Sequence, residues 1–190
     1  MERLPGLVRL GSFLLAAAAV LALAGAVAAV VALGHLGDAE VAYRQGVGED
    51  SVPAQVRYGL WYNLTATLVT ALVAGALAVL VRAPRRWAQI GVWCLAGAAW
   101  LGLGCGLTGG PELAAPDGGV PAATRQLLDN LMPRWYASGN TSLVLAVLGA
   151  FTVAAVVFLR PPVQEFYRST LDQGDPQWSA FFTDRAAGGS

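Results

Sequence analysis

The sequence contains no lysine and few charged residues of any kind. Its 190 residues are 13% charged and 56% hydrophobic, whereas soluble domains are usually ~25% charged. Twelve arginines balance twelve acidic residues, so the net charge is zero and no whole-chain charge attracts nucleic acid. This composition excludes an ordinary soluble domain, and we expect no nucleic-acid partner.

Cysteine and histidine are also scarce. The two cysteines, Cys94 and Cys105, lie in one apolar run, ~16 Å apart along a helix, which excludes a disulfide within that helix. No Cys-x-x-Cys pair occurs, so a thiol oxidoreductase is not expected. The single histidine, His35, has only scattered acids near it, without the spacing of a metal site, and we expect a solvated acidic loop there (Asp38, Glu40, Glu49 and Asp50).

The usual sequence signatures of catalysis are missing too. Neither G-x-S-x-G, nor H-E-x-x-H, nor a P-loop is present. We therefore predict no catalytic residue, no metal and no cofactor, and we do not expect an enzyme.

What the chain has in abundance is long apolar runs. Four of them match or approach the ~20 residues that cross a bilayer, and none has an ionisable residue in its interior (10–34, 58–81, 88–108 and 141–159). The first run is far longer than the ~7–15 apolar residues of a signal peptide, so we interpret it as an uncleaved span. The fold class predicted is all-α: an integral membrane four-helix bundle over residues 1–160.

The arginines predict the orientation of this bundle. Eight of the twelve lie in the N-terminus, the short 82–87 hairpin and the tail, and four lie in the two longer loops. Since cytoplasmic loops carry the excess of arginine, both termini are expected in the cytoplasm. The absence of lysine beside abundant alanine and glycine indicates a GC-rich genome, so we expect a bacterial plasma membrane.

Short helices are expected at both membrane surfaces. In the first outer loop Asp38 is a plausible N-cap for a helix ending near Gly46, and Ser51 can begin a helical run into the second span. In the second outer loop one apolar face predicts a helix that lies on the membrane or caps the bundle (Leu127, Leu128, Leu131 and Trp135). Residues 161–174 predict an interfacial helix with Val163, Phe166 and Tyr167 on one side, and residues 175–190 a flexible tail.

The hairpin RAPRRWAQ concentrates positive charge between two spans. Its arginines, with two from the tail, are expected to contact anionic lipid headgroups (Arg82, Arg85, Arg86, Arg160 and Arg168). A dedicated phosphate site would need further partner groups, so the hairpin chiefly indicates orientation.

Polar residues form one stripe on the second span. Asn63, Thr67 and Thr70 share a helix face, and Asn140 and Thr141 lie at a similar depth in the fourth span. In lipid such groups need partners. The stripe is therefore either the wall of a ligand-binding vestibule or a set of structural hydrogen bonds between helices.

Small residues recur within the third span at intervals of four (Cys94, Ala98, Gly102 and Gly106). Small-x-x-x-small faces let helices approach closely. This face is expected to pack against another helix, either within the chain or in a homo-oligomer.

Two short motifs carry a resemblance. The arginine-rich hairpin leading into Trp87-Ala88, and Phe166-Tyr167-Arg168 after a proline, resemble motifs of small uncharacterised four-span membrane proteins of actinobacteria. Gln89 stands where those proteins carry arginine, and their tail motif has the aromatic pair in the opposite order. The resemblance covers most of the chain and implies architecture alone.

The lack of any charge inside the spans guides the functional prediction. Ion-coupled transporters hold an ionisable residue within a span, and this chain has none. We predict a non-catalytic accessory, scaffold or regulatory subunit of a membrane complex, with a protein partner or a second copy. The alternative is a protein that binds or passes lipids or small ligands along the polar face of the second span.

Overall fold

The computed structural model describes residues 6–47, 51–83, 86–108, 127 and 130–172. These residues are helical almost throughout and contain no strand. The helices are α1 (Gly6–Val47), α2 (Ser51–Leu80), α3 (Arg86–Thr108), α5 (Arg134–Phe158) and α6 (Pro161–Asp172).

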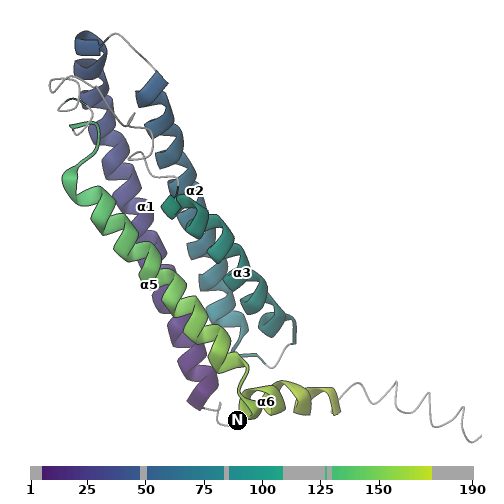
Figure 1. The fold of residues 1–190 in the computed structure, drawn as a ribbon. Helices are drawn as coiled ribbons and strands as arrows, with labels where there is room; N and C mark the ends of the chain where they lie inside the picture. The colour runs from purple at the N-terminus through teal and green to yellow at the C-terminus, as the bar shows by residue number, and fades with distance from the viewer. Residues whose placement is uncertain (1–5, 48–50, 84–85, 109–126, 128–129, 173–190) are drawn as a thin grey trace, which may run out of the picture.

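Four of these helices are long and apolar enough to cross a membrane. Figure 1 shows α1, α2, α3 and α5 side by side, with α6 across one end of the bundle. We call the end with the N-terminus and α6 the lower end, and the end where α1 leads into α2 the upper end. The all-helical fold, with four long helices at the four apolar runs, is confirmed within the described residues.

The helices pack through small and branched apolar side chains. α1 lies along both α2 and α5, and α3 packs against α2 and α5. Glycine permits close approach at two points: a Cβ on Gly11 would lie 2.7 Å from the Phe158 ring, and one on Gly91 would lie 2.9 Å from Leu77. The outer surface remains apolar, with Phe13, for example, 69% exposed. Large apolar side chains on the outside are what lipid covers in a membrane protein.

α1 is much longer than predicted. It runs without a break from Gly6 to Val47, ~63 Å at 1.5 Å per residue, about twice the thickness of a hydrocarbon core. Asp38 therefore does not begin a separate helix, contrary to the prediction. The extension contains no proline, and its Leu36 and Tyr43 are almost fully buried, so tertiary packing carries the helix past the end of its apolar run.

The upper end has a small core of its own. It joins the extension of α1, the first turns of α2 and residues that precede or begin α5 (Ala32, Leu36, Tyr43, Val56, Leu60, Leu131 and Tyr136). Leu127 packs against this cluster, so close to Gly46 that a Cβ there would lie 2.6 Å from the leucine. Leu127 and Leu131 therefore pack on the upper end of the bundle. Residues 131–133 are not helical and Trp135 belongs to α5, so the predicted helix through these residues is not shown, and Leu128 lies outside the described residues.

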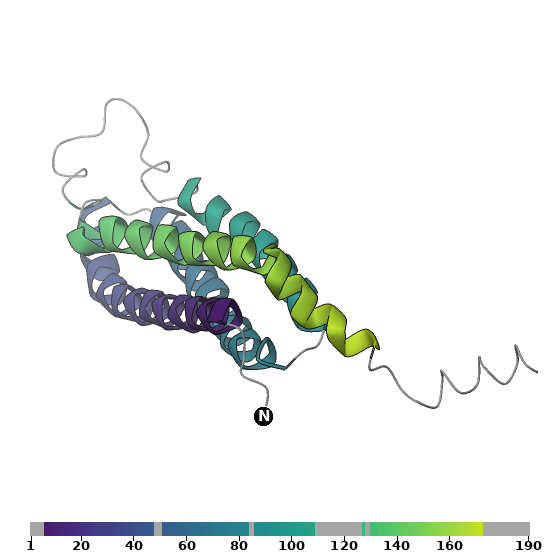
Figure 2. The same ribbon diagram turned by 90° about the horizontal axis from the view of Figure 1, so that it is seen from below.

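At the lower end α6 docks on the bundle. Val163 and Tyr167 are 0% and 2% exposed, and Phe166 packs against the same core. The Tyr167 hydroxyl donates a hydrogen bond to the Val81 carbonyl at 2.6 Å, and the Phe158 ring lies beside it. The predicted apolar side of α6 therefore turns toward the bundle, while the helix itself runs outward from it (Figure 2).

Burial raises the pKa of Tyr167 from 10.0 to about 12. Because only the neutral phenol fits this site, its contribution to stability is complete below pH 10 and is lost as the pH rises through about 12. We expect Tyr167→Phe to be less stable than the wild type by about 1 kcal/mol at pH 8, with the difference vanishing between pH 10 and 12. Thermal unfolding of both proteins across this range measures it, and parallel pH profiles would contradict the docked phenol.

Candidate functional site

The predicted polar stripe forms a cluster between α2 and α5. The side-chain amide of Asn63 donates to the Tyr136 hydroxyl at 2.8 Å and to Oδ1 of Asn140 at 2.9 Å. We call Asn63, Tyr136 and Asn140 the amide cluster. Both N–H groups of the Asn63 amide are engaged here, so the cluster joins the two helices and leaves that amide no donor for a ligand.

The other predicted stripe residues do not extend this cluster. Thr67 is buried and its hydroxyl donates to the Asn63 carbonyl at 2.7 Å, one turn earlier in the same helix. Thr70 is buried farther down α2. Thr141 is exposed on the opposite side of α5 from the neighbouring helices. The structure therefore brings together Asn63, Thr67 and Asn140, but not Thr141.

Tyr136 is the member that the sequence interpretation missed. Trp135, directly before it in the chain, is 49% exposed. Tyr136, one position on, is 5% exposed. Its spacing of four from Asn140 puts both side chains on one face of α5, and this spacing was the available signal.

A pocket lies directly below the amide cluster, where all four spans meet. It is bordered by Gly25 of α1, Thr67 of α2, Leu103 of α3 and Asn140 of α5, with leucine and valine side chains around them. The volume open to the centre of a water molecule is about 10 Å³, which matches a single water. Most of the lining is apolar, and in this conformation the predicted vestibule has no room for a larger ligand.

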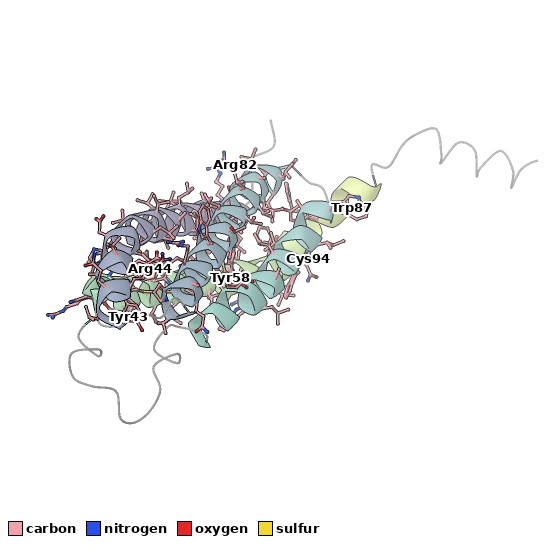
Figure 3. The ribbon with its side chains drawn as sticks, turned by 90° about the horizontal axis from the view of Figure 1, so that it is seen from above. Tyr43, Arg44, Tyr58, Arg82, Trp87 and Cys94 are labelled. Atoms are coloured by element: carbon pink, nitrogen blue, oxygen red, sulfur yellow. The ribbon has the colours of Figure 1, made fainter. Side chains whose placement is uncertain are left out.

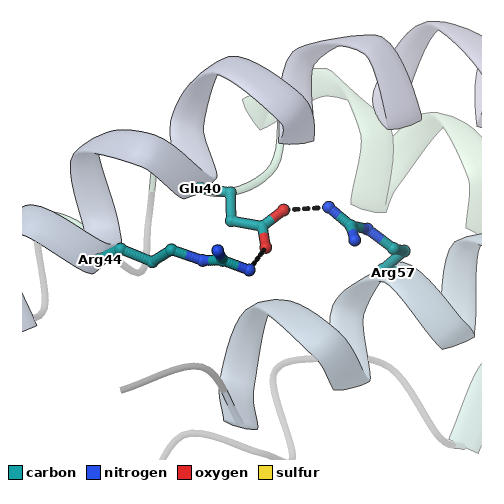
Figure 4. A network of polar contacts seen from close by, with 3 residues as sticks. All are labelled: Glu40, Arg44 and Arg57. Carbon is teal, nitrogen blue, oxygen red and sulfur yellow. Dashed lines mark hydrogen bonds and ion pairs between the residues drawn. The ribbon is translucent and has the colours of Figure 1, made fainter. Parts of the chain in front are cut away.

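A second polar group ties α1 to α2 at the upper end. Glu40 is 6% exposed, and its two carboxylate oxygens bond Arg44 of the same helix, at 2.6 Å, and Arg57 of α2. Figure 4 shows the carboxylate between the two guanidinium groups. Both arginine side chains are about half exposed, so the group is a partly buried bridge between helices.

Glu40 thus differs from the solvated acid that we predicted. The spacing of four between Glu40 and Arg44 is visible in the sequence, but the pairing with Arg57 depends on how the two helices meet. His35 is exposed and its Nε2 lies 3.1 Å from the Asn130 carbonyl. Within the described ranges, no three metal-ligating side chains lie together.

The predicted lipid-headgroup arginines gather at the lower end as far as the structure describes them. Arg82 and Arg160 are exposed, and Figure 3 shows Arg82 at the end of α2. Arg86 and Arg168 lie in α3 and α6, and the description covers only their backbone; Arg85 lies outside the described residues. Gln89, the residue that departs from the resembling group, donates to the Phe158 carbonyl at 3.1 Å and so caps the end of α5.

The small-residue face of α3 points largely away from the bundle. Cys94 and Ala98 are exposed, whereas the packed side of α3 carries Val92, Leu95, Ala99 and Leu103. Gly102 is half-buried, and its carbonyl accepts a hydrogen bond from Tyr62 at 3.0 Å. The surroundings of Gly106 lie outside the described residues. Cys94 and Ala98 are therefore free of the packing within the chain.

No family model matches the chain, and no curated protein or solved structure matches it at a significant level. The resemblance to four-span proteins of actinobacteria stays a prediction.

The amide cluster predicts a contrast between two substitutions. Asn63→Leu keeps the volume but removes both hydrogen bonds to α5, so we expect a loss of about 1–2 kcal/mol in the free energy of unfolding. Thr67→Val removes only a bond within α2, and its loss is expected to stay below about 0.5 kcal/mol. Unfolding in mixed micelles measures both, and equal losses would show that the amide cluster does not join the helices.

Proposed function

We propose that the chain is a non-catalytic multi-pass protein of a bacterial plasma membrane, and that it serves as an accessory, scaffold or regulatory subunit of a membrane complex. The lower end, with both termini, faces the cytoplasm in this proposal. The excess of arginine on that side supports the orientation.

The observation that carries the proposal is how the interior polar groups are used. The Asn63 amide bonds two side chains of α5, the Ser12 hydroxyl bonds the Ala78 carbonyl, and the Glu40 carboxylate bonds two arginines. Each of these groups bonds at least one residue of another helix. Groups used in this way stabilise the bundle rather than supply a nucleophile, a base or a proton path, so activity is expected at the surface.

The exposed side of α3 is the surface that best suits a protein partner. Cys94 and Ala98 are small and exposed, and Trp93, Trp100 and Leu101 are exposed on the same helix. Small exposed residues spaced by four let a second helix approach closely in lipid. The partner in this proposal is a transmembrane helix of another subunit, and a second copy of the chain is the next candidate.

The alternative function, binding or passage of a lipid or small molecule through the bundle, has less support. The pocket beside Thr67 and Asn140 holds about 10 Å³, far below the ~300 Å³ at which ligand pockets begin. Ligands of this protein are instead expected at its surface, where anionic lipid headgroups can meet Arg82 and Arg160.

Purification in a mild detergent tests the proposed partner. The tagged chain, isolated from its native membrane, is expected to bring a stoichiometric second subunit, identified by mass spectrometry. Ala98→Phe places a bulky ring on the exposed small-residue face of α3 and should reduce recovery of the partner at least roughly tenfold. Leu72→Phe makes a similar change on the exposed side of α2 and should leave recovery unchanged.

Two results would contradict this proposal. One is a monomer that carries no other protein at any detergent strength. The other is an equal fall in recovery of the partner in the Ala98→Phe and Leu72→Phe variants, since the small-residue face of α3 would then have no special role.

A further inference from the structure

Arg82 is held in place by the bundle, although its guanidinium is exposed. Its Nε–H donates to the Ser12 hydroxyl at 3.0 Å, and that hydroxyl donates to the Ala78 carbonyl at 2.7 Å. Ser12 itself is 2% exposed, in the contact between α1 and α2. The bond to a buried residue of another helix fixes the base of the guanidinium and limits the directions in which its remaining N–H groups can point.

Within the described residues, no carboxylate binds the remaining four N–H groups of Arg82. An arginine has five N–H donors, and only Nε is engaged within the described part of the chain. Among the described acidic side chains, Asp38 and Glu40 lie at the upper end, and Glu165 is exposed on α6 and forms no ion pair with Arg82. A forked donor of this kind fits the oxygens of a phosphate.

A second arginine lies on the same side of α1. Arg9 is exposed and precedes Ser12 by three residues, which puts the two side chains ~60° apart around the helix and in neighbouring turns. Arg9 therefore borders the place where Arg82 meets α1. Two arginines from two helices can hold one phosphate that neither would bind alone.

The surface next to these arginines is apolar. Phe13 of α1 is 69% exposed and lies four residues after Arg9, and Val79 of α2 is 67% exposed and lies three residues before Arg82. At these spacings each apolar side chain lies one turn from its arginine on the same face of the helix, toward the middle of the bundle. A free phosphate ion gains nothing from such a surface, whereas the acyl chains of a lipid would cover it.

We propose that Arg82, oriented by Ser12 and assisted by Arg9, forms a defined site for the phosphate of one anionic phospholipid where α1 and α2 meet at the lower end. This inference rests on the membrane insertion in the proposed function and sharpens its lipid contact. A general attraction depends on the number of positive charges alone, at ~1 kcal/mol each. A defined site depends on the fork of Arg82 and on the hydroxyl that orients it.

Charge-conserving substitutions distinguish a defined phosphate site from a general attraction to positive charge. Arg82→Lys keeps the charge but loses the Nε bond and the fork, and Ser12→Ala keeps all arginines but frees Arg82. Arg134→Gln is the control, because it removes one charge at an exposed position of α5 that the proposed site does not include. The wild type and the variants are compared by native mass spectrometry after exchange into micelles that contain dioleoyl phosphatidylglycerol or dioleoyl phosphatidylcholine.

The wild type is expected to retain one phosphatidylglycerol and no phosphatidylcholine. Arg82→Lys and Ser12→Ala should each weaken that retention about tenfold, and Arg134→Gln should keep it within about twofold. If Ser12→Ala fails to fold, Arg82→Lys alone decides. Equal retention by Arg82→Lys and the wild type, or a loss in Arg134→Gln as large as that in Arg82→Lys, would overturn the site.

Inorganic phosphate serves as the competitor that distinguishes a lipid from a free ion. Its addition to the phosphatidylglycerol complex is expected to leave the lipid bound, since the ion lacks acyl chains. Displacement by phosphate alone would overturn the assignment to a lipid. Neither outcome changes the test of a protein partner on α3, because that test concerns another face of the bundle.

Discussion

In a bilayer, the environment that we propose for the four long helices, each polar group must find its hydrogen-bond partner within the protein. A helix meets this requirement for its backbone, because it bonds its own N–H and C=O groups. The requirement also decides where the few polar side chains lie. Asn63 spans the gap to Tyr136 and Asn140, and Ser12 reaches the Ala78 carbonyl of the next helix. Thr67 bonds its own helix. These three side chains therefore lie where a neighbouring carbonyl or side chain satisfies them.

The same requirement connects the two ends of the molecule with its proposed role. At the upper end Glu40 holds α1 to α2, and at the lower end Tyr167 holds α6 to the last turn of α2. These contacts leave the middle of the bundle to apolar packing, with a pocket that fits one water. A frame fixed at both ends, with apolar outer faces, suits a protein that acts by presenting surfaces to lipids and neighbouring subunits.

The four long apolar helices could be predicted because hydropathy measures directly the apolar length that a helix needs to cross a bilayer. Hydropathy does not report where a helix ends in water, so the extension of α1 to Val47 was missed. The period of α6 predicted which side is apolar, but not that Val163 and Tyr167 would be buried against the bundle. Whether an apolar stripe meets lipid or protein depends on tertiary contacts that no local pattern contains.

The candidate site shows the same division between local and tertiary information. The depth and chemistry of Asn63 and Asn140 were evident from the sequence, and the structure places them in one cluster. Adjacent positions on a helix differ by ~100° in direction, which is why Tyr136 is buried beside Asn140 while Thr141 is exposed. The pairing of Glu40 with Arg57 joins α1 to α2. Sequence spacing alone could not predict it, because it depends on how the two helices pack.

The central claim is that the spans cross the plasma membrane with α1 projecting outside and α6 inside. Labelling with a membrane-impermeant maleimide tests it most directly, using single cysteines in a Cys94→Ala, Cys105→Ala background. Val41→Cys should react in intact cells, Val20→Cys should stay unlabelled, and Arg160→Cys should react only after the membrane is opened. Labelling of Arg160→Cys in intact cells, or of Val20→Cys as fast as Val41→Cys, would contradict the claim.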